Sequence, residues 1–125
     1  AYESTRVSGK VVIMGSSSVT PVMEKLKEAY AEINPNVSIE INMSDSSNGV
    51  KSVISGTCDI GMASRELKQS EIESGVQGTV IANDGIAIIV NNNNPLKGLS
   101  SEDVKNLYTG VAKKWEDLSG AVWAE

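Results

Sequence analysis

Short apolar stretches alternate with polar loops along the first part of this chain, and the loops are rich in serine, threonine and asparagine. Residues 11–14 form a continuous apolar run, which is typical of a strand buried on both faces. Residues 37–42 alternate between apolar and polar, the period of a half-buried strand. A third apolar stretch covers residues 58–62. The pattern therefore predicts three strands in this part of the chain.

Helical patterns separate these strands. Thr20 and Pro21 are typical of a helix start, with a hydroxyl at the N-cap and proline at the first helical position. Apolar residues then recur at helical spacing as far as Ile33, where an Asn-Pro-Asn sequence ends the helix. The second strand is followed by a short predicted helix that ends at Gly56. Residues 64–74 are predicted to be a loop with one helical turn.

The next part of the chain returns to an extended pattern and then breaks. Residues 80–82 and 86–90 are apolar and β-branched, which predicts two further strands. Four asparagines and a proline over residues 91–95 form the clearest break in the chain. Strand–helix alternation followed by a crossing segment predicts the α/β class, with a parallel-rich sheet flanked by helices.

One more helix is predicted beyond this break. Ser100 and Asp103 have the spacing of a capping box, and Gly110 is expected to end the helix. The residues expected to face inward are Val104, Leu107 and Tyr108. Residues 1–9 are expected to be a polar lead-in, and residues 119–125 carry no clear pattern.

Composition excludes several classes of function. The chain has 125 residues, 40% hydrophobic and 22% charged, so a folded domain is expected rather than a disordered segment. A net charge of −5 without a basic stripe argues against nucleic acid as a partner. Histidine is absent, which removes the commonest general base and the commonest metal ligand. We therefore expect no catalytic residue, no bound metal and no cofactor.

Three polar loops follow the predicted strands, over residues 15–21, 44–49 and 61–65. Parallel strands end at one sheet edge, where ligands bind in open α/β sheets. A helix N-terminus at this edge offers unpaired N–H groups and roughly half a positive charge. Serine and threonine hydroxyls can donate to an oxyanion as well. Each loop alone is compatible with an ordinary turn or helix cap, and it is their convergence that favours a small-oxyanion site.

Arg65 is the most specific element of the third loop. An arginine just past a buried strand can form a two-pronged hydrogen bond to an oxyanion, which lysine cannot mimic. The alternative is a solvated arginine that pairs with Glu66 or another acid. The pattern of residues leaves both interpretations open.

Five motifs, in this order, resemble the phosphate-binding protein of bacterial ABC phosphate importers. They are Val-Ile-Met-Gly-Ser-Ser-Ser-Val-Thr-Pro at 12–21, Asp-Ser-Ser-Asn-Gly-Val-Lys at 45–51, Asp-Ile-Gly-Met-Ala-Ser-Arg-Glu-Leu-Lys at 59–68, Asn-Asp-Gly-Ile-Ala-Ile-Ile-Val-Asn at 83–91, and Leu-Tyr-Thr-Gly followed by Lys-Trp-Glu-Asp-Leu at 107–118. The resemblance covers residues 10–118. It implies a lobe of the type II periplasmic-binding-protein fold and a protein that closes over one phosphate at a hinge.

The resemblance also implies which residues meet phosphate. They are Ser17, Ser18, Val19 and Thr20 in the first loop, Ser46 and Ser47 in the second, and Ser64 and Arg65 in the third. Ser64 stands where some members carry an aspartate that accepts the proton of monohydrogen phosphate. Discrimination against sulfate would then depend on a serine hydroxyl, or another residue, accepting that proton.

Family members are longer than this chain and have two lobes. By resemblance, residues 1–90 are expected to belong to the first lobe, and residues 91–125 to the crossover and the start of a second, incomplete lobe. A truncated chain of this kind is expected to bind phosphate weakly or not at all, and to self-associate through exposed apolar surface. The implied partners are inorganic phosphate and the membrane subunits of an ABC importer. The implied location is extracytoplasmic, either periplasmic or lipid-anchored at the cell surface.

Alternatives from three classes stay open. The chain is also compatible with a receptor for another oxyanion such as sulfate, or with a half-length interaction module that has no ligand. An enzyme using a loop serine, such as a phosphatase or esterase, is disfavoured because neither histidine nor another evident base accompanies the serines.

Overall fold

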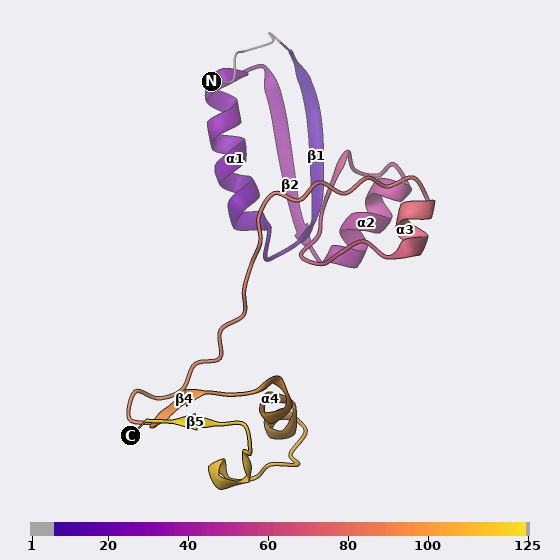
Figure 1. Cartoon of the computed structure of the whole chain (residues 1–125). Helices are drawn as coiled ribbons and strands as arrows, with labels where there is room; N and C mark the ends of the chain where they lie inside the picture. The colour runs from indigo at the N-terminus through magenta and orange to yellow at the C-terminus, as the bar shows by residue number, and fades with distance from the viewer. Residues whose placement is uncertain (1–6, 125) are drawn as a thin grey trace. The chain divides into compact units, whose positions relative to one another are not determined.

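The computed structural model describes residues 7–124 of the chain. The chain divides into two compact units, Ala1–Ile81 and Ala82–Glu125 (Figure 1). Residues 1–6 of the predicted lead-in lie outside the described residues, and Gly9 already begins the first strand. The predicted division into two lobe segments stays a prediction.

Unit 1 is built on a parallel sheet of three strands. These are β1 (Gly9–Ser16), β2 (Val37–Ser44) and β3 (Ile60–Met62), in the order β2-β1-β3. β1 is central and pairs in parallel with both neighbours, so that Ser16 lies beside Ser44 and Gly15 beside Met62. The predicted α/β class with a parallel sheet is therefore confirmed, and the strands end at one edge.

The third strand is shorter than predicted, because Asp59 replaces a strand pairing with its side chain. The Asp59 carboxylate accepts the backbone N–H of Val12 at 2.8 Å, and the Asp59 N–H donates to the Val12 carbonyl at 2.9 Å. Regular pairing begins one residue later, at Ile60. At this end of the sheet, the Asp59 carboxylate therefore takes up a β1 backbone N–H that a further strand residue would otherwise bind.

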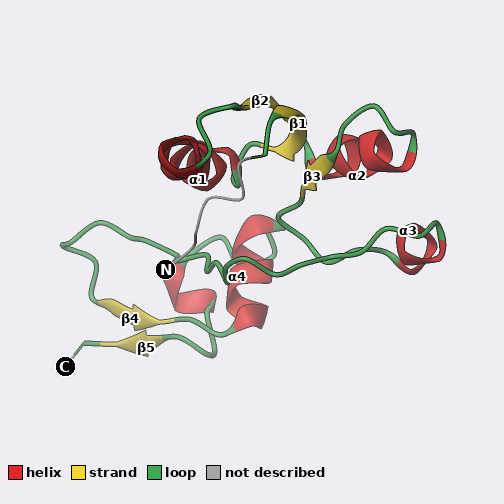
Figure 2. Cartoon of the chain, turned by 90° about the horizontal axis from the view of Figure 1, so that it is seen from above, coloured by secondary structure: helices red, strands yellow, loops and turns green. Residues whose placement is uncertain are grey.

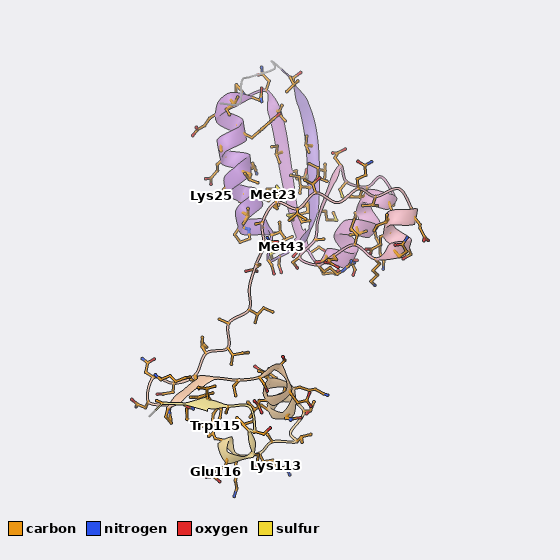
Figure 3. The ribbon with its side chains drawn as sticks, viewed as in Figure 1. Met23, Lys25, Met43, Lys113, Trp115 and Glu116 are labelled. Atoms are coloured by element: carbon orange, nitrogen blue, oxygen red, sulfur yellow. The ribbon has the colours of Figure 1, made fainter. Side chains whose placement is uncertain are left out.

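Two helices cover the sheet. α1 (Thr20–Ile33) packs against β2, and α2 (Ser46–Ile54) packs against β1 and β3. Figure 2 shows the two helices on opposite sides of the sheet, as expected when both crossovers are right-handed. Met23 lies on the side of α1 toward the sheet and Lys25 on the other side (Figure 3). The predicted apolar face is only partly confirmed, because Val22 and Leu26 are 47% and 50% exposed.

The helix starts differ from the predicted ones. The N-cap of α1 is Val19, and the Thr20 hydroxyl donates to the Ser16 carbonyl at 3.1 Å instead of capping the helix. α2 begins within the predicted second loop because the Asp45 carboxylate accepts the Asn48 N–H at 2.9 Å and caps the first turn. Polar residues assigned to a loop thus form the first turn of a helix.

Three glycines allow α2 to lie directly on the strands. A methyl group on Gly49 of α2 would lie 2.8 Å from the carbonyl oxygens of both Met14 and Met62. One on Gly61 would lie 2.9 Å from the Gly49 carbonyl, and one on Gly15 would clash with the Met62 carbonyl. Backbone therefore meets backbone between α2, β1 and β3 at these glycines.

Unit 2 contains a small antiparallel pair, β4 (Leu96–Gly98) with β5 (Val122–Trp123), together with α4 (Ser101–Tyr108) and the short 3-10 helix η1 (Trp115–Asp117). The predicted capping box is confirmed. The Ser100 hydroxyl accepts the Asp103 N–H, and the Asp103 carboxylate accepts the Ser100 N–H, both at 3.1 Å. None of the described helices is long and apolar enough to span a bilayer.

Tyr108 does not face inward as predicted, because the residue is 83% exposed. Asp103 is buried instead, held by Ser100 and by the N–H of Gly120 at 3.3 Å. Helical geometry places Tyr108 about 140° around the axis from Asp103. The carboxylate and its partners therefore set the buried face of α4, and Tyr108 falls outside it.

The two strands predicted over residues 80–82 and 86–90 are absent. Between α3 (Gln69–Glu73), which is the predicted helical turn, and β4, the structure contains no helix or strand. Residues 77–90 make no backbone–backbone hydrogen bond within the described part of the chain. Their large apolar side chains are mostly exposed, as shown by Val80 at 81% and Ile86 at 97%. A strand needs a neighbour to satisfy its backbone, and the described residues supply none here.

Replacing Gly49 by alanine tests the backbone contact. Alanine favours a helix by about 1 kcal/mol over glycine, but the added methyl group would meet two strand carbonyls that cannot move independently. We expect Gly49→Ala to destabilise unit 1 by about 1–2 kcal/mol net in urea unfolding. Lys51→Ala, exposed on the same helix, should change stability by less than about 0.5 kcal/mol. An unchanged or raised stability of Gly49→Ala would contradict the contact.

Candidate functional site

Three serine hydroxyls meet at the carboxyl edge of the sheet. The Ser16 hydroxyl, at the end of β1, donates to Ser64 Oγ at 3.0 Å, just after β3. Ser46 Oγ, at the start of α2, lies 3.3 Å from Ser64 Oγ and accepts the Ser64 N–H at 3.1 Å. α1 and α2 leave β1 and β2 toward opposite faces, so the carboxyl ends of β1 and β3 mark the topological switch point of this sheet.

The hydrogen count of this cluster leaves one donor for a ligand. Ser16 donates its hydroxyl hydrogen to Ser64 Oγ and so has no hydrogen left for a ligand. Either hydroxyl can donate between Ser46 and Ser64, so one of these two hydrogens lies between the oxygens and the other is free. If Ser64 donates to Ser46, it keeps one lone pair with which to accept a proton. The cluster can therefore present either a donor or a donor–acceptor pair to an anion.

The start of α1 adds backbone donors beside Ser16. The N–H groups of Ser18, Thr20 and Val22 donate to no acceptor among the described residues. Ser17 and Ser18 are exposed, so their hydroxyls are open to solvent. Free N–H groups at a helix start carry partial positive charge and suit an oxyanion.

Arg65 is fully engaged at its terminal nitrogens. Nη1 donates to Glu71 Oε2 and to the Glu66 carbonyl, both at 2.9 Å. Nη2 donates to Glu71 Oε1 at 2.8 Å and to the Ser47 hydroxyl at 3.3 Å. Of the two interpretations left open by the sequence, pairing with another acid is what the structure shows, and that acid is Glu71.

The ion pair is well shielded and strongly shifts Glu71. The side chains of Arg65 and Glu71 are 28% and 14% exposed. Glu71 also accepts the Lys68 N–H at 2.8 Å and so caps α3. The hydrogen bond from Arg65, followed by that from Lys68, lowers the pKa of Glu71 to about 2. The Glu71 hydrogen bond raises the pKa of Arg65 above its already high value. Both groups are therefore charged at neutral pH.

The predicted site residues fall into two sets. Contacts join Ser46, Ser47, Ser64 and Arg65. The first-loop residues Ser17, Ser18, Val19 and Thr20 follow Ser16 directly along the chain. Among the described residues, the first loop is joined to Ser46, Ser47, Ser64 and Arg65 by one side-chain hydrogen bond, from the Ser16 hydroxyl to Ser64.

Sequence reasoning missed two residues of the site, Asp45 and Glu71. Ser16 belongs to the first predicted polar loop but not to the predicted phosphate contacts, and the structure places it at the end of β1 with 3% exposure. Asp45 could have been recognised as the cap of α2 from its spacing to Asn48. Glu71 carries no such signal, because five residues of partly irregular chain lie between it and Arg65.

Two other kinds of site, a ligand pocket and a metal site, are not found at the serine cluster among the described residues. A shallow hollow in unit 2 is lined by Asn94, Pro95, Trp115, Glu116 and Trp123 and includes none of the predicted site residues. Figure 3 marks Trp115 and Glu116. Within residues 7–124 no group of three or more cysteine or acidic side chains is placed to hold a metal ion. The serine cluster and its arginine are the candidate site.

The chain matches the model of the PBP superfamily domain over residues 1–122. It is 57% identical over 119 residues to phosphate-binding protein PstS 2 of Streptococcus agalactiae serotype V, an alignment that covers 95% of this chain and 41% of that protein. It is 42% identical to phosphate-binding protein PstS 2 of Streptococcus pneumoniae serotype 4, covering 94% of the chain and 40% of the relative. The chain thus spans about two fifths of the length of these relatives.

Two solved structures similar to this chain are also of phosphate-binding proteins from phosphate ABC transporters. The phosphate-binding protein of a phosphate ABC transporter from S. pneumoniae superposes with a TM-score of 0.86 at 42% identity, over 94% of this chain and 46% of that one. A phosphate ABC transporter substrate-binding protein from Clostridium perfringens, solved with bound phosphate, superposes with a TM-score of 0.76 at 44% identity, over 93% and 47%.

Glu71 makes the stability of unit 1 depend on pH in a defined window. Its pKa in the folded chain, about 2, lies below the ordinary 4.5, so its contribution is fully present above about pH 4.5 and is lost as pH falls toward 2. We expect Glu71→Gln to flatten the pH dependence of urea unfolding in this window. Glu73→Gln, exposed two residues further along α3, should keep the wild-type slope. Equal slopes for all three proteins would contradict the ion pair.

Proposed function

The chain belongs to the PBP superfamily, and from that premise we propose that it forms the phosphate-binding wall of a solute-binding protein serving an ABC phosphate importer. One observation carries the proposal, namely that Ser16, Ser46 and Ser64 bring their hydroxyls together at the switch point of the sheet. The 57% identity to a phosphate-binding protein supports phosphate as the oxyanion.

The proposed contacts divide by chemistry. Backbone N–H groups at the start of α1 and the hydroxyls beside them would receive phosphate oxygens on one side, and the serine cluster would do so on the other. The proposed site residues are Ser17, Ser18, Val19, Thr20, Ser46, Ser47, Ser64 and Arg65. These donors are neutral apart from Arg65, so binding would depend on oriented dipoles more than on net charge.

Ser64 is the proposed discriminator between phosphate and sulfate. When its hydroxyl donates to Ser46, its remaining lone pair can accept the proton of monohydrogen phosphate. Sulfate at neutral pH has no proton to give. The competing proposal, a receptor for sulfate or another oxyanion, predicts that sulfate displaces phosphate at equal concentration.

Partners and location follow from the same premise. We propose that the whole protein is extracytoplasmic, periplasmic or lipid-anchored, and delivers phosphate to the membrane subunits of the importer. Residues 1–90 would belong to its first lobe, and residues 91–125 to the crossover and the start of the second. Binding without turnover fits the serine cluster, because no histidine is present in the sequence to activate a serine.

Phosphate titration of the chain tests the proposed contacts. Ser17 and Ser18 are exposed, so a bound anion would remain in contact with water and its affinity would be low. We expect amide resonances of Ser18, Thr20 and Ser64 to shift in nitrogen–proton NMR spectra, with a dissociation constant on the order of 1 mM. Ser64→Ala should weaken binding about tenfold. Ser38→Ala, exposed on β2, should not.

Two results of this titration would overturn the proposal. Phosphate shifts that map away from residues 16–20 and 64 would place the site elsewhere. An equal response to sulfate would remove phosphate as the preferred ligand. Sub-micromolar affinity would contradict the open character of the site while leaving its location in place.

Self-association is proposed to involve the irregular segment before the asparagine run. Residues 77–90 have no backbone–backbone partners among the described residues, and Ile86 and Ile89 are 97% and 88% exposed. Asp84 is the one charged residue in this segment, and apolar segments of low charge with a free backbone pair readily between chains. Sedimentation at protein concentrations on the order of 100 μM should show oligomers. We expect the double substitution Ile86→Lys with Ile89→Lys to dissociate the oligomers into monomers. Gln77→Lys should leave the oligomeric state unchanged. A monomeric wild-type chain would refute this.

A further inference from the structure

We propose that Glu71 and Arg65 form a fixed clamp that shapes the phosphate site, and that Arg65 holds the loops in place without contacting the phosphate. This inference rests on the proposed phosphate function and revises the role of one predicted ligand. Glu71 becomes a positioning residue, although no sequence motif pointed to it.

The first step is the hydrogen-bonding capacity of the guanidinium. Its two terminal nitrogens carry four N–H donors, and all four are used, by Glu71 twice, by the Glu66 carbonyl and by the Ser47 hydroxyl. Only the Nε–H of Arg65 makes no hydrogen bond to the described residues. The two terminal nitrogens of Arg65 that could bind an oxyanion in a bidentate manner already bind the Glu71 carboxylate in that manner.

The second step is the consequence of exchanging that carboxylate for phosphate. Glu71 is 14% exposed, and its other contact is the Lys68 N–H. Freeing Arg65 for phosphate would leave a shielded carboxylate without its cation, next to an incoming anion. Breaking a part-buried pair in this way is unfavourable, although less so than for a fully buried pair. A phosphate that leaves the pair intact avoids this cost.

The third step is what the clamp does for the serines. Glu71 joins α3 to the loop after β3, and Arg65 joins that loop to Ser47 in the first turn of α2. Ser46, next in the chain to Ser47, accepts the Ser64 N–H. The clamp therefore holds the hydroxyls of Ser46 and Ser64 at their observed separation, and a rigid donor set binds an anion without an ordering cost.

The fourth step is electrostatic. Arg65 and Glu71 cancel as a pair, and Asp45 lies close enough to contribute to the field at Arg65. The site therefore offers phosphate neutral hydroxyl and N–H donors, with no surplus cation. A site of this kind selects an anion by the placement of its hydrogen bonds.

A charge-neutral double substitution separates a clamp from a ligand. Arg65→Gln alone strands Glu71 beside the site, and we expect the phosphate dissociation constant to rise about tenfold. Combining Arg65→Gln with Glu71→Gln removes both charges and lets two amides pair. We expect this double variant to bind within about threefold of the wild type. If Arg65 were a direct ligand, the double variant would bind as weakly as Arg65→Gln, and that result would overturn the clamp.

A matched control removes an ion pair far from the site. Lys25 and Glu28 pair at 2.6 Å on the exposed surface of α1. The double variant Lys25→Gln with Glu28→Gln changes the same number of charges and should leave phosphate binding unchanged.

A second measurement needs no variant and stays informative if a substituted chain fails to fold. In the wild type, saturating inorganic phosphate should shift the amides of Ser18 and Ser64 while the side-chain Nη resonances of Arg65 stay in place. Movement of these Nη resonances together with the amides would refute the clamp and keep the phosphate function. Absence of any amide shift would refute the phosphate function itself, and the inference would fall with it.

Discussion

Close backbone contact between α2 and the strands is the constraint on which the site depends. Gly15, Gly49 and Gly61 remove the side chains that would otherwise hold the helix away from the sheet. The start of α2 therefore reaches the strand ends, where Ser46 meets Ser64 and Ser64 meets Ser16. A single added methyl group would act on the sheet packing and on the serine cluster together. Stability and binding geometry are thus linked through one contact.

The proposed anion site lies in an acidic chain, so binding there would depend on local dipoles that oppose the net charge. The free N–H groups at the start of α1 and the one unused hydroxyl hydrogen of the serine cluster follow the strand ends, and charges beyond about a Debye length are screened. The Arg65–Glu71 pair adds structure at this edge without adding net charge. Its carboxylate caps α3 and its guanidinium reaches α2, so one ion pair joins three elements.

The irregular segment before the asparagine run shows the limit of local pattern. Its isoleucines and valines have strong β propensity, and they predicted two strands. Propensity describes how a residue fits a sheet, but a strand exists only where another strand takes up its hydrogen bonds. None of the described residues does so, and side chains such as Ile86 stay exposed. The same absence of a neighbour makes this segment the proposed place of self-association.

Local regularities determined the elements of this protein, because helix caps, periodic apolar residues and proline breaks act over a few residues. They predicted β1, β2 and α1, the capping box of α4 and the polar residues at the strand ends. Only the tertiary structure decided that Asp103 faces inward while Tyr108 does not, and that Arg65 pairs with Glu71. These outcomes depend on side chains that folding brings together. The spacing of Arg65 and Glu71 along the chain does not predict that they form an ion pair. The serines could be named from the sequence, but the partner of each donor was decided by packing.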